Sequence, residues 1–277
     1  MISFAVTVLG ILAATLIPAY IALYLIPNLL TFIPTRYIAA AGVGLTFWFF
    51  FDTMGDATGV GVNYGLGGGT SHVGLIVAFL AGIAALAMFD YFAVPSPTFS
   101  QSAPSAVNKY SRSLVLIPVG IAAVIGIHGL GEGWDFASVA SGPSATSLIN
   151  SFGGNLEAVS YIFHKFLEAS IVAAAYTCFL SRVESVRKAW WHIPILGILF
   201  GGTSVIGSIF GYYVAFDTTY FYAFGVTSAL YAALRLAEAA NYSFKIGSNA
   251  PTYLGWKIFI ALAIGFFALY TAALLHS

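Results

Sequence analysis

Charged side chains are scarce in this sequence: Asp, Glu, Lys and Arg make up 7% of the 277 residues, whereas 60% are hydrophobic. This composition excludes a soluble globular domain and indicates an integral membrane protein with little mass outside the bilayer. Ten basic and ten acidic residues balance each other, so nothing suggests a nucleic-acid partner. The single cysteine, Cys178, excludes an intrachain disulfide, and its apolar surroundings favour a small packing residue.

The N-terminus has no basic segment before its first apolar run, which favours a retained membrane span over a cleaved signal peptide. Eight apolar runs are long enough to cross a bilayer, at about residues 2–26, 37–56, 72–94, 113–137, 155–180, 190–214, 217–240 and 253–275. The predicted fold is an all-α membrane protein, an eight-transmembrane-helix bundle in which residues 1–277 form a single transmembrane domain. The Pro/Ser-rich segment at about 95–112 is predicted to be a flexible linker.

The basic residues predict the orientation of the chain. Every one except Lys165 falls at alternate connections between the spans, namely Arg36, Lys109, Arg112, Arg182, Arg187, Lys188, Arg235, Lys245 and Lys257. By the positive-inside rule that side is cytoplasmic, so the linker is cytoplasmic and both termini are extracytoplasmic. We expect a multi-pass protein of the plasma (cell) membrane.

Two of the apolar runs each carry a His and a Glu four residues apart. The pairs are His128 with Glu132, and His164 with Glu168. On a helix this spacing places both side chains on one face, and intramembrane ionisable groups generally serve function. Because the two helices would be antiparallel, Glu132 should lie level with His164, and His128 level with Glu168. Two imidazoles and two carboxylates suit Zn²⁺, with Fe²⁺, Mn²⁺ or Co²⁺ as alternatives.

Four further acidic residues lie near predicted helix ends. Asp52 and Asp56 share a helical face at the outer end of the second span, where they would form a cation entrance or a solvated helix end. Asp90 and Glu238 lie near the cytoplasmic ends of the third and seventh spans. They would line an exit, although we favour a role as partners of nearby basic residues.

These motifs resemble those of the ZIP (Zrt-/Irt-like) metal transporters. The segment from His128 to Gly133 is similar to that family's HNxPEG motif on the fourth helix, and His164 to Ala169 to its HKxPEG or HExPHE motif on the fifth. Weaker similarities cover residues 51–57, 201–207 and 229–239. The resemblance implies eight spans with both termini outside, and metal ligation by His128, Glu132, His164 and Glu168.

The sequence departs from the family pattern at several motif positions. Gly131 and Leu167 replace the motif prolines. Many members of the family hold a second metal ion, and the matching positions here are Gly129, Lys165 and Ser204, none of which is a good ligand. Lys165 would place a positive charge where a second cation would bind, so we expect one metal ion rather than two.

We therefore expect a ZIP-like transporter, not an enzyme, that moves a divalent cation, Zn²⁺ first among candidates, into the cytoplasm. Its expected partners are the metal ion and the lipid bilayer, with a homodimer left open. The main alternative is an intramembrane metalloenzyme, a protease or lipid hydrolase, that uses the same residues. Two other readings are a proton relay or buried ion pair that includes Lys165, and a haem-binding electron carrier with His128 and His164 as axial ligands.

Overall fold

The structure is a computed structural model that describes residues 2–29, 32–58, 73–93, 116–180, 191–245 and 255–274. All regular elements within these ranges are helical. The helices are α1 (Phe4–Asn28), α2 (Thr35–Thr58), α3 (Val73–Ala93), α5 (Leu116–Ser141), α6 (Leu148–Ser151), α7 (Asn155–Leu180), α9 (His192–Gly211), α10 (Thr219–Lys245) and α11 (Trp256–Leu274). The expected linker at about 95–112 lies outside the described residues.

Several of these helices indicate an integral membrane protein. Six of them, α1, α2, α3, α5, α7 and α9, are long and apolar enough to cross a bilayer. Helix α10 is more polar because Tyr, Thr, Ser, Arg and Glu are interspersed along it, and the apolar stretch of α11 is shorter, at Trp256–Ala272. Large apolar side chains such as Leu9, Leu80 and Ile264 are more than 60% exposed on the protein surface, as expected where lipid replaces water.

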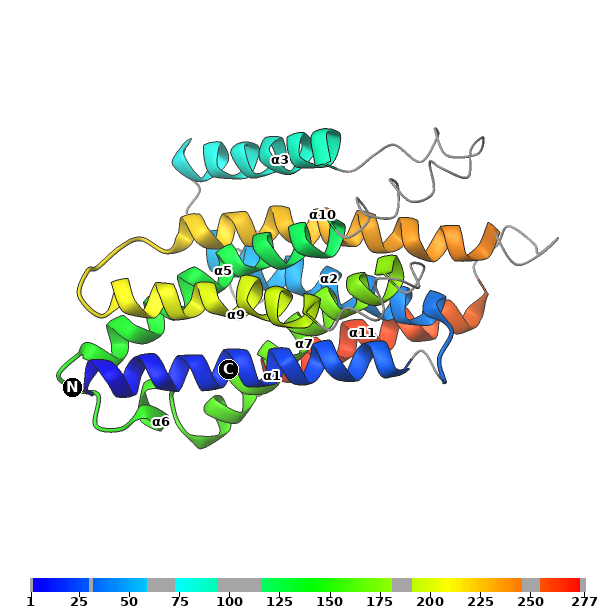
Figure 1. Ribbon diagram of the computed structural model, residues 1–277. Coiled ribbons are helices and arrows are strands. Elements are labelled where there is room, and N and C mark those ends of the chain that lie inside the picture. The colour runs from blue at the N-terminus through cyan, green and yellow to red at the C-terminus, as the bar shows by residue number, and fades with distance from the viewer. Residues whose placement is uncertain are drawn as a thin grey trace.

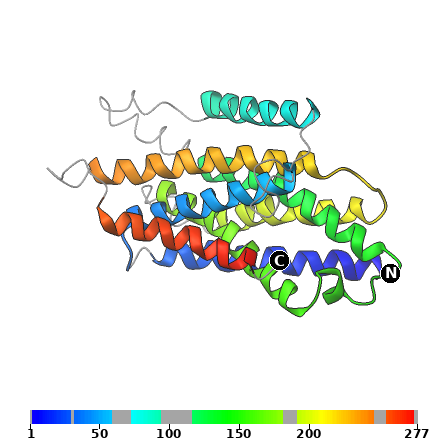
Figure 2. The ribbon, with the colours of Figure 1, turned by 180° about the vertical axis from the view of Figure 1, so that it is seen from behind.

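The long helices lie side by side along one axis of the bundle (Figures 1 and 2). They form two groups by their closest contacts. The first helix group consists of α1, α5, α7 and α9, and the second consists of α2, α3, α10 and α11. The two groups meet mainly where α5 contacts α10 and where α2 contacts α7. Helix α3 lies at the edge of the bundle, against α10 (Figure 1).

Glycines allow the backbones of α5 and α9 to touch. A Cβ atom at Gly133 would overlap with the backbone of Ser204, and one at Gly207 with the backbone of Leu130. Small residues permit such close approach between membrane helices, where packing rather than the hydrophobic effect drives association. Without the motif proline, α5 runs unbroken past Gly131 from Leu116 to Ser141. Its glycines therefore serve helix packing at this place.

The core of the bundle is apolar around a short polar band. Fully buried side chains such as Leu23, Ile121, Ile125 and Leu236 pack between the helices. The buried ionisable groups His128, Lys165 and Glu168 lie within the same interior. Because unpaired charges in such surroundings are costly, their contacts define the candidate site.

Candidate metal centre

Helices α5 and α7 bring the two motifs together by crossing in opposite directions. His128 Nε2 lies 3.6 Å from Glu168 Oε1, so these residues are level with each other, as the antiparallel register predicts. Glu132 differs from the expectation, because it contacts Lys165 rather than His164. Lys165 precedes Glu168 by three residues and therefore shares its helical face. The next residue along α7 thus takes the place expected for His164.

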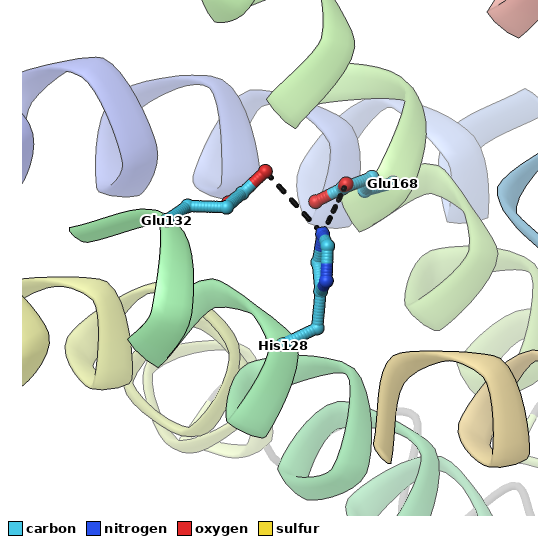
Figure 3. A group of neighbouring side chains, drawn as sticks. All are labelled: His128, Glu132 and Glu168. Atoms are coloured by element: carbon cyan, nitrogen blue, oxygen red, sulfur yellow. Dashed lines mark ion pairs between the residues drawn. The ribbon is translucent and has the colours of Figure 1, made fainter. Parts of the chain in front are cut away.

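His128 is buried, with 1% of its side chain exposed. Its Nε2 atom lies 3.3 Å from Glu132 Oε1 and 3.6 Å from Glu168 Oε1, and the two carboxylates approach the ring from two sides (Figure 3). Within the described part of the chain, neither ring nitrogen makes a hydrogen bond. Buried polar atoms are normally satisfied, so this imidazole has capacity for a further ligand.

Neighbouring rings and a glycine hold the His128 side chain in place. Phe49 from α2 and Tyr222 from α10 each pack edge-on against the imidazole, with ring centroids 5.1 Å away. A Cβ atom at Gly225 would lie 3.0 Å from His128 Nδ1. The absence of a side chain there lets the ring lie against α10. The imidazole extends from α5 of the first helix group and is therefore fixed by residues of the second helix group.

Lys165 connects the two glutamates on the side away from His128. Its side chain is 1% exposed, and its Nζ atom forms ion pairs with Glu132 Oε2 and, at 2.5 Å, with Glu168 Oε2. Each glutamate thus directs one oxygen to the ammonium and the other toward His128. The charge-assisted contacts orient both carboxylates. A buried ion pair of this kind is the alternative that the sequence left open.

His164 belongs to the same network but contacts different atoms. Its Nε2 atom lies 2.8 Å from Glu168 Oε1 and 3.5 Å from Asp52 Oδ2. Asp52 was expected at an entrance, but it reaches the centre itself and has 26% of its side chain exposed. Asp56, the other expected entrance residue, is exposed one helical turn further along α2.

Three of the four expected ligands form one compact group. Ligand atoms of His128, Glu132 and Glu168 all lie within 4.8 Å of one another, and Figure 3 shows them converging from α5 and α7. His164 is outside this group and makes a hydrogen bond to Glu168 instead. Imidazole and carboxylate groups at such distances are able to bind a divalent cation.

The expected exit residues lie in a separate cluster. Arg235 on α10 pairs with Asp90 on α3 and, at 2.5 Å, with Glu238, and Tyr231 Oη donates a hydrogen bond of 3.0 Å to Asp90. These contacts agree with the interpretation of Asp90 and Glu238 as partners of a basic residue. They also attach α3 to α10.

Sequence reasoning missed two polar residues beside the centre. Asp135, one turn beyond Glu132 on α5, accepts hydrogen bonds from Tyr222 Oη at 2.6 Å and Thr218 Oγ1 at 2.9 Å. The positions 128, 132 and 135 share one helical face, and this spacing could have identified Asp135. Tyr161, one turn before Lys165 on α7, has a buried hydroxyl with no hydrogen-bond partner in the described ranges.

A scan against protein-family models, a search of curated proteins and a search of solved structures each found no match for this chain. The resemblance to the ZIP transporters therefore rests on the motifs alone.

Proposed function

We propose that this protein is a ZIP-like transporter, rather than an enzyme, that moves a divalent metal cation into the cytoplasm, with Zn²⁺ the expected substrate. The observation that carries the proposal is the environment of His128. Four ligands arranged tetrahedrally around Zn²⁺ at about 2.0–2.1 Å lie about 3.3–3.5 Å apart. The distances from His128 Nε2 to the two glutamate oxygens, 3.3 and 3.6 Å, are close to that separation.

The charges of the contacting residues also favour a divalent cation. Asp52, Glu132 and Glu168 carry three negative charges when ionised, and Lys165 balances one of them. With neutral imidazoles, a bound divalent ion would neutralise the remaining two. Neutrality matters because a net charge in the bilayer interior is costly. Fe²⁺, Mn²⁺ and Co²⁺ carry the same charge, would neutralise the centre equally and are also candidate substrates.

The position of Lys165 favours one bound ion rather than two. Its ammonium lies between the Oε2 atoms of Glu132 and Glu168, the oxygens that would otherwise face a second cation. Gly129 and Ser204, at the other second-site positions, contribute no charge. His164 and Asp52 would then act beside the metal, where His164 orients Glu168 or joins the ligands as the ion moves.

Transport requires that the centre open to each side in turn. We propose eight spans, with α10 and α11 added to the six apolar helices, and both termini outside the plasma membrane. Most of the centre lies on α5 and α7 of the first helix group, whereas Asp52 and Tyr222 come from the second. Movement of one group against the other would change access to the ion.

Metal uptake into vesicles that contain the purified protein tests this proposal. His128→Gln should lower the rate of Zn²⁺ uptake at least about tenfold, because it removes an imidazole ligand. His192→Gln is the matched control, since His192 is also buried, on α9, but lies outside the cluster. It should change uptake less than about twofold. Equal uptake by His128→Gln and the unmodified protein would reject the assignment.

The second candidate is the intramembrane metalloenzyme, a protease or lipid hydrolase. It is favoured by the number of clustered ligands, because three protein ligands leave a coordination position for water, as in catalytic zinc sites. Tyr161, whose ring lies 5.6 Å from the Lys165 ammonium and whose buried hydroxyl has no hydrogen-bond partner among the described residues, is an additional polar group beside the cluster. Metal-dependent hydrolysis of a lipid or membrane peptide by the purified protein, without metal uptake, would decide for this candidate.

A further inference from the structure

An apolar groove lies between α1, α2, α7 and α11, away from the candidate metal centre. Its volume is about 420 Å³, within the range of small-molecule sites. Along α2 it extends from Tyr37 to Leu45, which corresponds to about 12 Å of helix rise. One leaflet of hydrocarbon is about 15 Å thick. The groove is therefore nearly as long as the acyl region of one leaflet.

The walls of the groove are almost entirely apolar. They are formed by side chains such as Ile26, Ile38, Ala174 and Ile264. The hydroxyl of Ser170 also lines the groove, but it donates its hydrogen to Phe166 O at 2.8 Å within α7. An occupant of this part must therefore be a hydrocarbon rather than a polar molecule.

Positive charge is concentrated at one end of the groove. Lys257, near the start of α11, lines it. Arg36, near the start of α2, donates a hydrogen bond of 3.1 Å to Tyr37 Oη and lies 4.8 Å from the centre of that ring, which lines the groove as well. Helices α2 and α11 begin at the same end of the bundle (Figure 1). The two cations therefore belong to the same end of the groove.

The ammonium group of Lys257 has no carboxylate partner among the described residues. Lys165 and Arg235 both pair with carboxylates, whereas Lys257 forms no ion pair with any described acidic residue. It is exposed, and its ammonium lies 5.8 Å from the ring of Trp256. Tryptophan and lysine at a helix end are typical of the headgroup level of a membrane.

We propose that this groove binds one anionic glycerophospholipid of the surrounding membrane. An acyl chain lies in the groove against its apolar walls, and the negatively charged headgroup contacts Lys257 and Arg36. Basic pockets between membrane helices attract anionic headgroups in this way. The site depends on the protein being in a membrane, but not on the proposed transport of metal.

A second groove in the same protein provides an internal comparison. It lies between α1, α6 and α7, has a volume of about 370 Å³ and is lined only by apolar residues, such as Ala13, Leu148 and Ile162. A lipid chain fits there as well, but none of the described residues that line this groove is a cation that could select a headgroup. A difference between the two grooves in their preference for anionic lipid therefore reports the effect of the basic residues.

Native mass spectrometry of the purified protein tests the proposal, with dioleoyl-phosphatidylglycerol and dioleoyl-phosphatidylcholine added in equal amounts. Each of the two basic residues should favour the anionic lipid by about fivefold, so the unmodified protein should retain it about twenty-five-fold better. Lys257→Gln should reduce this preference to about fivefold, and Lys257→Arg should keep it. Ala261→Phe, which fills the groove, should abolish selective retention. Ala13→Phe, which fills the second groove, should lower total lipid without changing the preference.

The outcomes separate a specific site from general lipid adhesion. The proposal fails if the unmodified protein retains both lipids equally, or if the preference is the same in Lys257→Gln. It also fails if Ala261→Phe, verified as folded by its thermal unfolding, still selects the anionic lipid. Lys257 is exposed, so its variants should fold normally, and the test does not depend on the groove-filling variant.

Discussion

Lys165 shares its charge between two glutamates in the interior of the bundle. The lysine side chain is 1% exposed and Glu168 is fully buried. Removing such ions from water is costly, and the cost is recovered only when every charge has close partners. The ammonium therefore fixes the Oε2 atoms of Glu132 and Glu168 and leaves their Oε1 atoms facing His128. In this arrangement a lysine orients two carboxylates of the candidate metal centre.

Replacement of this lysine should destabilise the metal-free protein. Lys165→Met leaves Glu132 and Glu168 without their common partner, and losing one side of a buried ion pair costs about 3–5 kcal/mol. Thermal unfolding in detergent should therefore shift to lower temperature. Zn²⁺ should restore more stability to this variant than to the unmodified protein, because the ion then supplies the missing positive charge.

Lys257→Met is the control for this experiment, because Lys257 is exposed and unpaired with any described carboxylate. Its unfolding temperature should match that of the unmodified protein. If Lys165→Met unfolds at the same temperature as this control, the ion pairs with the two glutamates are not stabilising. If Zn²⁺ has no larger effect on the variant, the carboxylates do not bind the ion.

Helical spacing predicted the residues of the centre better than their partners. The interval of four residues correctly placed His128 near Glu132 and His164 near Glu168. Lys165, rather than the expected His164, lies beside Glu132. Which of these two residues faces Glu132 depends on the rotation of α7 about its own axis, and sequence spacing does not define that rotation. The packing of Tyr222 against His128 joins residues 94 positions apart, and one sequence gives no signal for such a contact.

The pair α5–α9 depends on backbone contact between two helices. Gly126 and Gly133 on α5 face backbone atoms of α9, and Gly207 and Gly211 on α9 face backbone atoms of α5. Because α5 also carries His128 and Glu132, a shift of α9 would displace the centre. The glycines thus connect helix packing to the position of the candidate metal ligands.

Alanine substitution on α9 distinguishes packing from helix propensity. Gly207→Ala should lower the free energy of unfolding by about 1–3 kcal/mol, because the new methyl group would overlap with the backbone of Leu130. Gly202→Ala, in the same helix, meets only Ile198 at 3.4 Å. It should leave stability unchanged or raise it by up to about 1 kcal/mol. Thermal unfolding of both variants checks the difference, and equal losses would contradict the backbone contact.

Hydropathy located the long helices to within a few residues. The run predicted at 113–137 corresponds to α5 at Leu116–Ser141, and the run at 217–240 to α10 at Thr219–Lys245. The short helix α6, Leu148–Ser151, was not predicted. Its Ser147 side chain accepts a hydrogen bond from the backbone of Asn150, a local cap that an apolar-run search does not detect.

The arrangement of the whole bundle places the centre at the boundary between two helix groups. The first helix group holds most of the ionisable side chains of the centre. The second contributes Asp52, Phe49 and Tyr222. Contacts across the boundary include α2 against α7, where a Cβ atom at Gly42 would lie 3.0 Å from Ala174 Cβ. If transport requires the groups to move past each other, a covalent bond at this contact should stop it.

A pair of engineered disulfides tests this movement, in a Cys178→Ala background that lacks the only native cysteine. Gly42→Cys with Ala174→Cys joins the two groups, whereas Gly82→Cys with Thr227→Cys joins α3 and α10 within the second group, where the corresponding distance is 3.2 Å. Both distances are slightly below the usual disulfide range of about 3.5–4.5 Å, so small shifts suffice. Oxidation should abolish Zn²⁺ uptake only in the first variant, and reduction should restore it. Undiminished uptake by that variant in its fully cross-linked form would mean that the ion passes without relative movement of the groups.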